Sequence, residues 1–452
     1  MPPFFMQISQ LLLYFCCCLM EMFDKVAAGE KSICVLGLGY VGLPIALEFA
    51  RKFNVVGFDI NEERVQLMKQ GIDPSKEIET EIFLGKKITF TSNIEDIKDC
   101  GIYIVAVPTP INDANEPELK PLIGASTTVG KVISKGDYVI YESTTYPGCT
   151  EDDCVPVIEE ISGLKIGADF KVGYSPERIN PGDKERPLTK ILKIVSGSDE
   201  EALRNVSKLY ASIIEAGIYE AASIKVAEAA KIIENTQRDV NISLMNELSM
   251  IFNKIGINTH DVIDAAATKW NFHRYSPGLV GGHCIGVDPY YLVHKAEALG
   301  LHPRVIAAGR YTNDNMPAHI AQKAIKQLNA KGKVVKDSRI LIMGATFKEN
   351  VADIRNSKIV DVVTELQSYS VNVDVIDPHA DTNELKHEYG FGLASEPCGK
   401  YDGIILAVSH DGYKNLPASW YEQHATADAF LFDLKAIFRK QETRPALDYW
   451  SL

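Results

Sequence analysis

A glycine-rich turn that joins a short apolar run to an apolar, helix-like stretch limits the possible folds of this chain more than any other feature. Residues 33–36 are apolar, the turn reads Gly37-Leu38-Gly39-Tyr40-Val41-Gly42, and residues 44–53 have the composition of a helix. Glycine here permits a tight turn, close packing of helix on strand, and the approach of a pyrophosphate to backbone N–H groups. The pattern predicts a parallel α/β fold with a dinucleotide site, and an ordinary turn is the alternative.

A second strand is expected at residues 54–58, and Asp59 follows it about twenty residues after the glycine turn. A carboxylate at this place suits a hydrogen bond with the adenosine ribose, which favours NAD as the cofactor. Arg64 keeps NADP open as an alternative, because a guanidinium can face a 2′-phosphate.

Three further buried strands are each followed by polar side chains. The strands are expected at residues 102–107, 138–141 and 171–174, and the side chains are Thr109, Thr144, Glu177 and Arg178. Parallel strands hold ligands at their carboxyl ends, so both threonines are candidates for the nicotinamide side of the site. Hydroxyls also cap helices, and a Glu–Arg pair on a loop is equally compatible with an exposed ion pair.

A long helix is predicted at residues 223–254, which contain no Pro or Gly and carry apolar residues at helical spacing. This length exceeds that of the usual globular helix and suits both a connection between two α/β halves and a dimer surface. Lys231 and Asn235 are four residues apart and therefore share one face. A solvated lysine is the alternative to a site residue.

A cysteine lies in a glycine-rich loop at residues 277–291, which reads PGLVGGHCIGVDPYY. Glycines on both sides of Cys284 leave the backbone free to approach a ligand, and His283 and Asp288 lie within a few residues of the thiol. An isolated cysteine is more often a small buried apolar residue than a nucleophile. The loop therefore gains its meaning only together with the rest of the chain.

The α/β pattern restarts in the C-terminal part of the chain. Strands are expected at residues 339–343, 371–376, 403–408 and 430–434, with a helix from about residue 356. Lys348 and Arg355 are candidates to pair with phosphates, although the glycine fingerprint is absent here. The sequence thus predicts an α/β protein with two Rossmann-like, doubly wound domains joined by a long central helix.

Charge and cysteine usage narrow the class of protein. The 452 residues carry a formal net charge of −13, which argues against a nucleic-acid partner. The nine cysteines lack zinc-site or redox spacing, so we expect a reducing compartment, the cytoplasm, and no metal. The apolar run at residues 11–20 is too short to span a bilayer and no basic residue precedes it, so we expect no stable membrane insertion; a weak anchor is the alternative.

Seven segments, in order along the chain, carry a resemblance to a known family. They are GLGYVGLP at 37–44, VPTPIN at 107–112, YESTTYPGCTE at 141–151, YSPERINPGD at 174–183, KVAEAAKIIENTQRD at 225–239, PGLVGGHCIGVDPYYL at 277–292 and TFKENVADIRNS at 346–357. From about Lys31 to Phe438 the chain resembles the UDP-glucose/GDP-mannose dehydrogenase superfamily. More narrowly, it resembles the UDP-N-acetylhexosamine 6-dehydrogenases of surface polysaccharide synthesis, such as the Vi polysaccharide type.

The resemblance implies a domain organisation and a reaction. The expected parts are an extension at 1–30, disordered or non-native; an NAD-binding domain at 31–215; a central helical dimerisation domain with the cysteine loop at 216–330; a UDP-binding domain at 331–440; and a tail at 441–452. The reaction is the oxidation of the 6-hydroxymethyl group of a UDP-sugar to a carboxylate with two NAD. We expect a homodimer.

The resemblance also implies roles for individual residues. Cys284 would hold the intermediate aldehyde as a thiohemiacetal, and Lys231 and Asn235 would bind the oxygen that becomes negative. Asp288 would order a water and accept protons, with Glu177 and Thr109 lining the same cleft. The other candidates for substrate contact are Arg178, Arg274, Tyr275, Gly281, Phe347 and Lys348, and Lys348 is a cofactor candidate as well.

The identity of the sugar rests on a departure from the UDP-glucose branch. Val287 stands where that branch has a lysine before the aspartate, and His283 precedes the thiol. Both features favour UDP-GlcNAc or UDP-GalNAc, which the sequence does not separate, and UDP-ManNAc or UDP-glucose is the alternative. Arg274 is a candidate for phosphate binding across a dimer or for an ordinary surface charge.

Two alternatives to this reaction stay open. A non-catalytic nucleotide-sugar binding protein would keep the fold but lose the nucleophile, whereas Cys284 is present. A simple dehydrogenase of hydroxy acids would use one NAD per substrate and would need no thiol.

Overall fold

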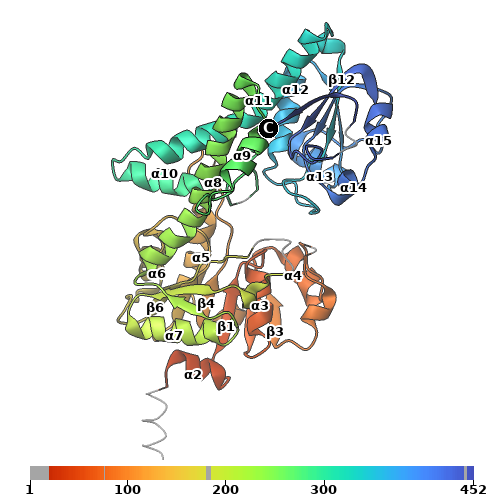
Figure 1. Ribbon diagram of the computed structural model, residues 1–452. Coiled ribbons are helices and arrows are strands. Elements are labelled where there is room, and N and C mark those ends of the chain that lie inside the picture. The colour runs from red at the N-terminus through yellow and green to blue at the C-terminus, as the bar shows by residue number, and fades with distance from the viewer. Residues whose placement is uncertain (1–19, 76, 113, 180–184, 283, 442–444) are drawn as a thin grey trace, which may run out of the picture. The chain divides into compact units, whose positions relative to one another are not determined.

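The computed structural model describes residues 20–75, 77–112, 114–179, 185–282, 284–441 and 445–452. The chain divides into two compact units, one of residues 1–233 with 290–295 and the other of residues 234–289 with 296–452. Each unit holds its own sheet with helices packed against it (Figure 1). The division falls inside the long helix α8 (Ile224–Ile255). The bounds of α8 confirm the predicted helix at 223–254.

The sheet of the first unit has eight strands. Their order is β3 (Ile88–Thr91), β2 (Val55–Phe58), β1 (Ser32–Leu36), β4 (Cys100–Val105), β5 (Tyr138–Tyr141), β6 (Lys171–Tyr174), β7 (Lys193–Gly197) and β8 (Ile218–Glu220). Neighbouring strands pair in parallel, except β6 with β7, which are antiparallel. The strand order reverses between β1 and β4, which is where a doubly wound sheet opens a crevice for its ligand.

Helices bury the apolar faces of this sheet. They are α2 (Met22–Ala27), α3 (Gly42–Phe49), α4 (Glu62–Lys69), α5 (Lys120–Gly130), α6 (Val155–Ser162) and α7 (Glu200–Ala211), with short turns η1 (Thr80–Phe83), η2 (Ile94–Ile97), η3 (Thr150–Cys154) and η4 (Leu188–Lys190). Ile33 and Val35 of β1 pack in one core with Phe49 of α3 and Leu209 of α7. All six residues of β4 are buried, as expected of a parallel strand covered on both faces.

The C-terminal part of the expected extension, residues 22–30, is folded onto this unit. Residues 1–19 lie outside the described residues, whereas Met22 and Val26 of α2 belong to the core. The backbone N–H of Phe23 donates to Asn205 Oδ1 at 3.0 Å, and the Lys208 ammonium lies 2.6 Å from the Glu21 carboxylate. Residues 22–30 therefore belong to the N-terminal domain, because burial of two apolar side chains fixes α2 in place.

The second unit has a sheet of five parallel strands. Their order is β10 (Asn372–Ile376), β9 (Arg339–Met343), β11 (Tyr401–Leu406), β12 (Ala425–Asp433) and β13 (Asp448–Ser451). The helices are α9 (Thr259–Ala266), α11 (Arg304–Ala330), α12 (Lys358–Ser368), α13 (Thr382–Tyr389), α14 (Asp411–Lys414) and α15 (Ala418–Gln423), with η5 (Val335–Asp337). The helix α10 (Asp288–Ala298) is divided like α8, since its residues 290–295 belong to the first unit. The predicted fold class, two Rossmann-like domains and a long central helix, is confirmed.

The C-terminal segment is a strand, not the expected tail. β13 pairs in parallel with β12, and its Trp450 ring lies 4.6 Å from Phe432. Leu452 is fully buried in the same core. Four residues at an edge strand are too few to show an alternating pattern in the sequence.

No helix within the described ranges is both long and apolar enough to cross a bilayer.

The glycines of the first turn serve different purposes. A Cβ on Gly42 would lie 1.8 Å from the carbonyl oxygen of Gly37, so only glycine lets α3 start this close to the end of β1. A Cβ on Gly39 would meet no protein atom within 4 Å. Gly39 therefore leaves open space above the turn, which a bound phosphate group can occupy.

This difference makes a pair of substitutions informative. Gly42→Ala is expected to lower the free energy of unfolding by about 3 kcal/mol, because the added methyl group forces the turn and the helix apart. Gly39→Ala, the matched control, is expected to leave the unfolding midpoint unchanged. Thermal or urea unfolding of both variants measures the difference. Equal stability of the two variants would contradict the close packing at Gly42.

Candidate active site

The glycine turn is held by the carboxylate that follows β2. The N–H of Leu38 donates to Asp59 Oδ2 at 2.9 Å, and the N–H of Asn61 donates to Asp59 Oδ1 at 2.9 Å. Arg64 donates to the Leu38 carbonyl at 3.0 Å. Each carboxylate oxygen keeps a second lone pair, so Asp59 is able to accept from a ribose hydroxyl as well. The open space at Gly39 and this carboxylate fit a dinucleotide at the turn.

Thr109 and Thr144 lie just beyond the carboxyl ends of β4 and β5, and both are half-buried. The Tyr291 hydroxyl donates to the Pro110 carbonyl at 3.1 Å, and the Ser143 hydroxyl donates to the Val107 carbonyl at 2.7 Å. The alternative that these threonines cap helices is wrong, because α5 begins at Lys120 and η3 at Thr150. Their contact with the cofactor stays a prediction.

Glu177 is buried and fixed in one orientation. The N–H groups of Arg178 and Ile179 donate to its Oε1 at 2.5 and 2.6 Å, and the Lys193 ammonium lies 3.2 Å from its Oε2. Glu177 is 8% exposed, so the alternative of an exposed ion pair on this loop does not hold. The Arg178 guanidinium, half-buried, donates to the Leu192 carbonyl at 3.0 Å.

Helix α8 buries two of the predicted site residues. Lys231 is 9% exposed and Asn235 is 5% exposed, so Lys231 is not the solvated lysine that the pattern alone favoured. Asn235 Nδ2 donates to Asp288 Oδ2 at 2.5 Å, and Asp288, the first residue of α10, is 3% exposed. The structure thus brings Asn235 and Asp288 into direct contact, although they are 53 residues apart in sequence.

Cys284 lies one turn before α10. Its carbonyl accepts from the N–H groups of Val287 and Asp288 at 3.1 and 2.8 Å, which places the residue at the start of the helical path. The residue is exposed. His283, the other feature of this motif, lies outside the described residues.

An asparagine on α8 clamps the loop that leads to Cys284. Asn246 Oδ1 accepts from the N–H of Gly278 at 2.8 Å, and Asn246 Nδ2 donates to the carbonyl of Gly278 at 3.0 Å. The same amide group lies 2.8 Å from Asn313 Oδ1 of α11, and Asn313 Nδ2 lies 2.7 Å from Asp239 Oδ1. All of these side chains are buried, so the network fixes the loop's position relative to α8.

The far side of the cysteine loop is fixed to the C-terminal domain by close backbone contact. The N–H of Gly282 donates to the Asn356 carbonyl at 3.1 Å, and Asn356 Nδ2 donates to the Gly282 carbonyl at 2.8 Å. Gly282 has φ +80°, and a Cβ there would lie 2.9 Å from the Phe347 ring. Glycine is therefore required at this position by both backbone and space.

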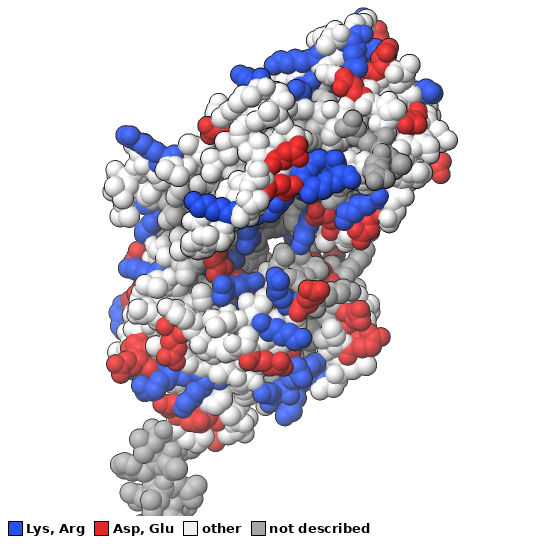
Figure 2. Space-filling view, viewed as in Figure 1, with Lys and Arg blue, Asp and Glu red and all other residues white. Residues whose placement is uncertain are grey.

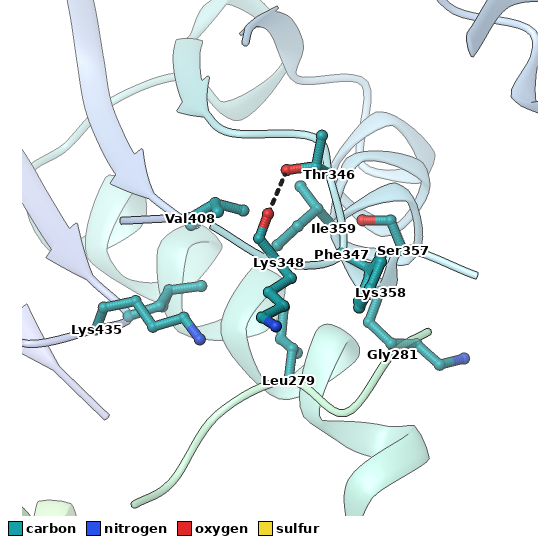
Figure 3. Close-up of a pocket in the computed structure, with 12 residues that line it drawn as sticks. Leu279, Gly281, Thr346, Phe347, Lys348, Ser357, Lys358, Ile359, Val408 and Lys435 are labelled. Atoms are coloured by element: carbon teal, nitrogen blue, oxygen red, sulfur yellow. Dashed lines mark hydrogen bonds between the residues drawn. The ribbon is translucent and has the colours of Figure 1, made fainter. Parts of the chain in front are cut away.

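A pocket in the second unit brings three predicted substrate residues together (Figure 3). Its lining comprises Leu279, Gly281, Thr346, Phe347, Lys348, Ser357, Lys358, Ile359, Ala407, Val408, Leu434 and Lys435. The loops after β9 and β11 contribute to it, and the strand order reverses between these two strands. Figure 3 shows Lys348 and Lys435 extending toward the same space. Two ammonium groups at the switch point of a parallel sheet suit a phosphate-bearing ligand.

The loop after β9 is held in the same way as the first glycine turn. Asp377, which follows β10, accepts from the N–H groups of Ala345 and Thr346 at 2.6 and 3.2 Å. His410 Nδ1 accepts from the N–H of Asn350 at 3.0 Å, so its Nε2 carries the proton and donates to Asp377 at 3.0 Å. Burial opposes ionisation of Asp377, but these hydrogen bonds outweigh it and hold its pKa well below the ordinary value.

Arg274 and Tyr275 do not line this pocket. Arg274 Nη2 lies 2.5 Å from Asp264, and the same carboxylate contacts Arg439 and, at 3.0 Å, Lys440. Within this chain Arg274 is therefore part of a surface ion-pair cluster. Figure 2 shows basic and acidic side chains interspersed on the visible face of each unit.

Three segments of the chain match successive domains of one family. Residues 31–214 match the NAD binding domain, 225–315 the central domain and 341–440 the UDP binding domain of the UDP-glucose/GDP-mannose dehydrogenase family. These segments cover more than half of the chain, which therefore belongs to this family. It is a UDP-sugar dehydrogenase with NAD as its cofactor.

Individual relatives agree with this assignment. The chain is 52% identical over 416 residues to a UDP-N-acetyl-D-glucosamine 6-dehydrogenase of Pseudomonas aeruginosa, covering 92% of this chain and 99% of the relative. It is 49% identical over 424 residues to protein CapL of Staphylococcus aureus, covering 94% and 100%. Among solved structures, the UDP-D-ManNAc dehydrogenase of Pyrococcus horikoshii has 30% identity and a TM-score of 0.84, covering 93% of this chain and 99% of that one.

The sequence did not point to three residues that hold the predicted site together. Lys193 contacts Glu177, Glu142 contacts Lys193, and Asn246 is hydrogen-bonded to Gly278. Glu142 lies in the motif at 141–151, where nothing in the sequence marks it as a site residue, and the other two are ordinary polar residues of a strand and a helix. Only the fold reveals that all three are buried.

The clamp at Gly278 yields a testable prediction. Asn246→Ala leaves the N–H and carbonyl of Gly278 and the Asn313 side chain without this partner, so we expect the free energy of unfolding to fall by about 2 kcal/mol. We also expect a lower kcat, because the loop that carries Cys284 is released. Asn241→Ala is the control, since Asn241 is on the same helix, is half-buried, and among the described residues donates to the Gln237 carbonyl. Equal effects of both variants on stability and kcat would contradict the clamp.

Proposed function

We propose that the protein oxidises the 6-hydroxymethyl group of a UDP-N-acetylhexosamine, UDP-GlcNAc or UDP-GalNAc, to the uronic acid. The observation that carries this proposal is the exposed Cys284 four residues before a buried Asp288 that is hydrogen-bonded to Asn235. A dehydrogenase that stops at an aldehyde or ketone needs no thiol, whereas oxidation to an acid gains from one.

The covalent step retains the intermediate. A dinucleotide held at the Gly37–Gly42 turn and Asp59 would supply the hydride acceptor for each of the two oxidations. The aldehyde left by the first oxidation adds the Cys284 sulfur to give a thiohemiacetal, and the second oxidation converts this adduct to a thioester. Water then displaces the sulfur, releasing the carboxylate and the free thiol. The aldehyde therefore never leaves the enzyme.

The other predicted site residues have side chains that suit the changes of charge at the carbon. Lys231 and the amide of Asn235 are held on one face of α8, where they bind the oxygen that becomes negative. Asp288, ordered by Asn235, positions a water and takes up protons. Glu177, whose carboxylate is fixed by two backbone N–H groups, is the second candidate for a base, and Thr109 lines the cleft with it.

The acetamido sugar is supported by two observations. Relatives of about half identity are named UDP-N-acetyl-D-glucosamine 6-dehydrogenases, whereas the UDP-N-acetyl-D-mannosamine dehydrogenases are 30–34% identical. Val287 before Asp288 replaces the lysine of the UDP-glucose branch. UDP-ManNAc and UDP-glucose are therefore the less favoured substrates.

We further propose a cytoplasmic homodimer that serves surface polysaccharide synthesis. A relative named CapL supports the polysaccharide role. Exposed apolar side chains recur along α8 with spacings of seven, eleven, seven and four residues, which places them on one face of the helix. They are Val226, Ile233, Leu244, Ile251 and Ile255. Such a stripe suits pairing with a second copy of the helix.

Substitution of the thiol tests the covalent mechanism. Cys284→Ser is expected to bind NAD as the wild type does and to lose uronic acid formation by about a thousand-fold or more, because the hydroxyl is a poorer nucleophile. Cys398→Ser, at another exposed cysteine, is the control and is expected to stay active. Acid formation is followed by mass spectrometry with UDP-GlcNAc and UDP-GalNAc. Full turnover by Cys284→Ser would rule out the covalent step.

The rival functions predict other outcomes. A non-catalytic binding protein would bind a UDP-sugar without any turnover. A two-electron dehydrogenase would release an aldehyde or ketone at one NADH per substrate and would tolerate loss of the thiol.

A further inference from the structure

Glu177 and three other side chains, each from a different part of the chain, form a buried cluster. The Lys193 ammonium, at the start of β7, lies 2.6 Å from Glu142 Oε2 and 3.2 Å from Glu177 Oε2, and it donates to the Pro176 carbonyl at 3.1 Å. The Tyr210 hydroxyl, on α7, donates to Glu142 Oε1. The side chains of Glu142 and Lys193 are at most 2% exposed. All of these residues belong to the first unit.

The charges of this cluster do not balance when every group is in its ordinary state. Two carboxylates share one ammonium, and the tyrosine is neutral, so the buried cluster carries one excess negative charge. A buried charge without a partner is costly, and a carboxyl group in this position takes up a proton instead. One of the two glutamates is therefore expected to be the group that exchanges a proton.

The contacts decide which glutamate this is. Glu177 accepts two backbone N–H groups through Oε1, and hydrogen bonds of this kind stabilise the ionised form. Glu142 lacks backbone donors to its carboxylate among its described contacts and is the more deeply buried of the two, with a side chain that is 0% exposed. Protonation therefore costs less at Glu142.

We propose that Glu142 and Lys193 are positioning residues for Glu177, and that a proton held by Glu142 determines how strongly Lys193 stabilises the Glu177 carboxylate. When Glu142 is neutral, Lys193 pairs with Glu177 alone and makes it a weaker base. When Glu142 is ionised, Lys193 is shared between two carboxylates and Glu177 becomes the stronger base. This inference rests on the proposed role of Glu177 in the reaction.

The electrostatics of the cluster agree with this assignment. Burial raises the pKa of Glu142 to about 7; the charge of Glu177 adds to the rise, whereas Lys193 opposes it. Burial disfavours the charged form of Lys193, but its two carboxylate partners outweigh this and raise its pKa above the ordinary value. Burial also keeps Tyr210 neutral by raising its pKa. Glu142 is thus neutral below about pH 7 and ionised above it, while Lys193 stays charged.

The test is a pair of pH titrations. In the wild type, kcat for the UDP-sugar is expected to rise through about pH 7, and infrared difference spectra should show the C=O band of a protonated carboxyl group disappearing over the same range. Glu142→Gln keeps the shape of the side chain, but it should remove both the infrared band and the rise in kcat, since Lys193 then pairs permanently with Glu177. Glu142→Asp should restore a titrating band.

Glu201→Gln is the matched control. Glu201 lies on α7 in the same unit, is half-exposed and lies 3.2 Å from the Lys171 ammonium, so this variant should keep the rise in kcat and the band. A band and a pH profile unchanged in Glu142→Gln would overturn the assignment, and so would a wild type without a carboxyl band that titrates near pH 7. Because the band is measured without substrate, a protein that shows it but oxidises no UDP-sugar would refute the proposed function alone.

Discussion

Parallel pairing of strands is the constraint on which the rest of this structure depends. All the β-pairs between named strands are parallel except that of β6 with β7. The strands β1 to β6 therefore end at one edge of the first sheet, as β9 to β13 do in the second, and pass into loops there. The glycine turn, Asp59, Thr109 and Thr144 follow strand ends in the first sheet, and the lysine-bearing pocket follows β9 and β11 in the second. Parallel strands need long crossovers, which the helices supply while burying the sheet faces.

A second theme is the use of buried polar contacts to fix residues that must not move. A carboxylate after the second strand of each Rossmann-like domain accepts backbone N–H groups from the turn that follows the first, through Asp59 in one domain and Asp377 in the other. Asn246 fixes the cysteine loop by accepting from the N–H of Gly278, and Asn235 fixes Asp288 by donating to its carboxylate. Hydrogen bonds of this kind are worth little net stability individually, but the loss of one partner is costly, so each arrangement is strongly specified.

The fold was largely predictable because its main signals are local. Continuous apolar runs predicted β1, β4 and β5, and the absence of Pro and Gly predicted α8 to within one residue at each end. The strands β3, β7, β8 and β13 were not predicted. Of these, β8 and β13 are short strands at sheet edges. They are three and four residues long and partly exposed, so their stability comes from one neighbour and not from a pattern of their own. The docking of α2 was missed because a helix of six residues is too short to show a helical period in the sequence.

The site was predictable only as far as its motifs reach. Residue type and order pointed to Cys284, Lys231, Asn235 and Asp288, but no spacing in the sequence shows that Asn235 contacts Asp288 or that Lys231 is buried. The support of Glu177 by Lys193 and Glu142 depends on three strands and a helix meeting in space. Long-range contacts of this kind follow from the topology of the sheet, which a single sequence does not state.

The proposed mechanism requires that one sugar is oxidised twice on the same enzyme. The most direct measurement is the amount of NADH formed per sugar consumed by the purified protein with excess NAD and, in parallel, UDP-GlcNAc, UDP-GalNAc, UDP-ManNAc and UDP-glucose. The proposed mechanism predicts two NADH per sugar with UDP-GlcNAc or UDP-GalNAc and no release of aldehyde. One NADH per sugar, or no NADH with any of the four, would contradict it.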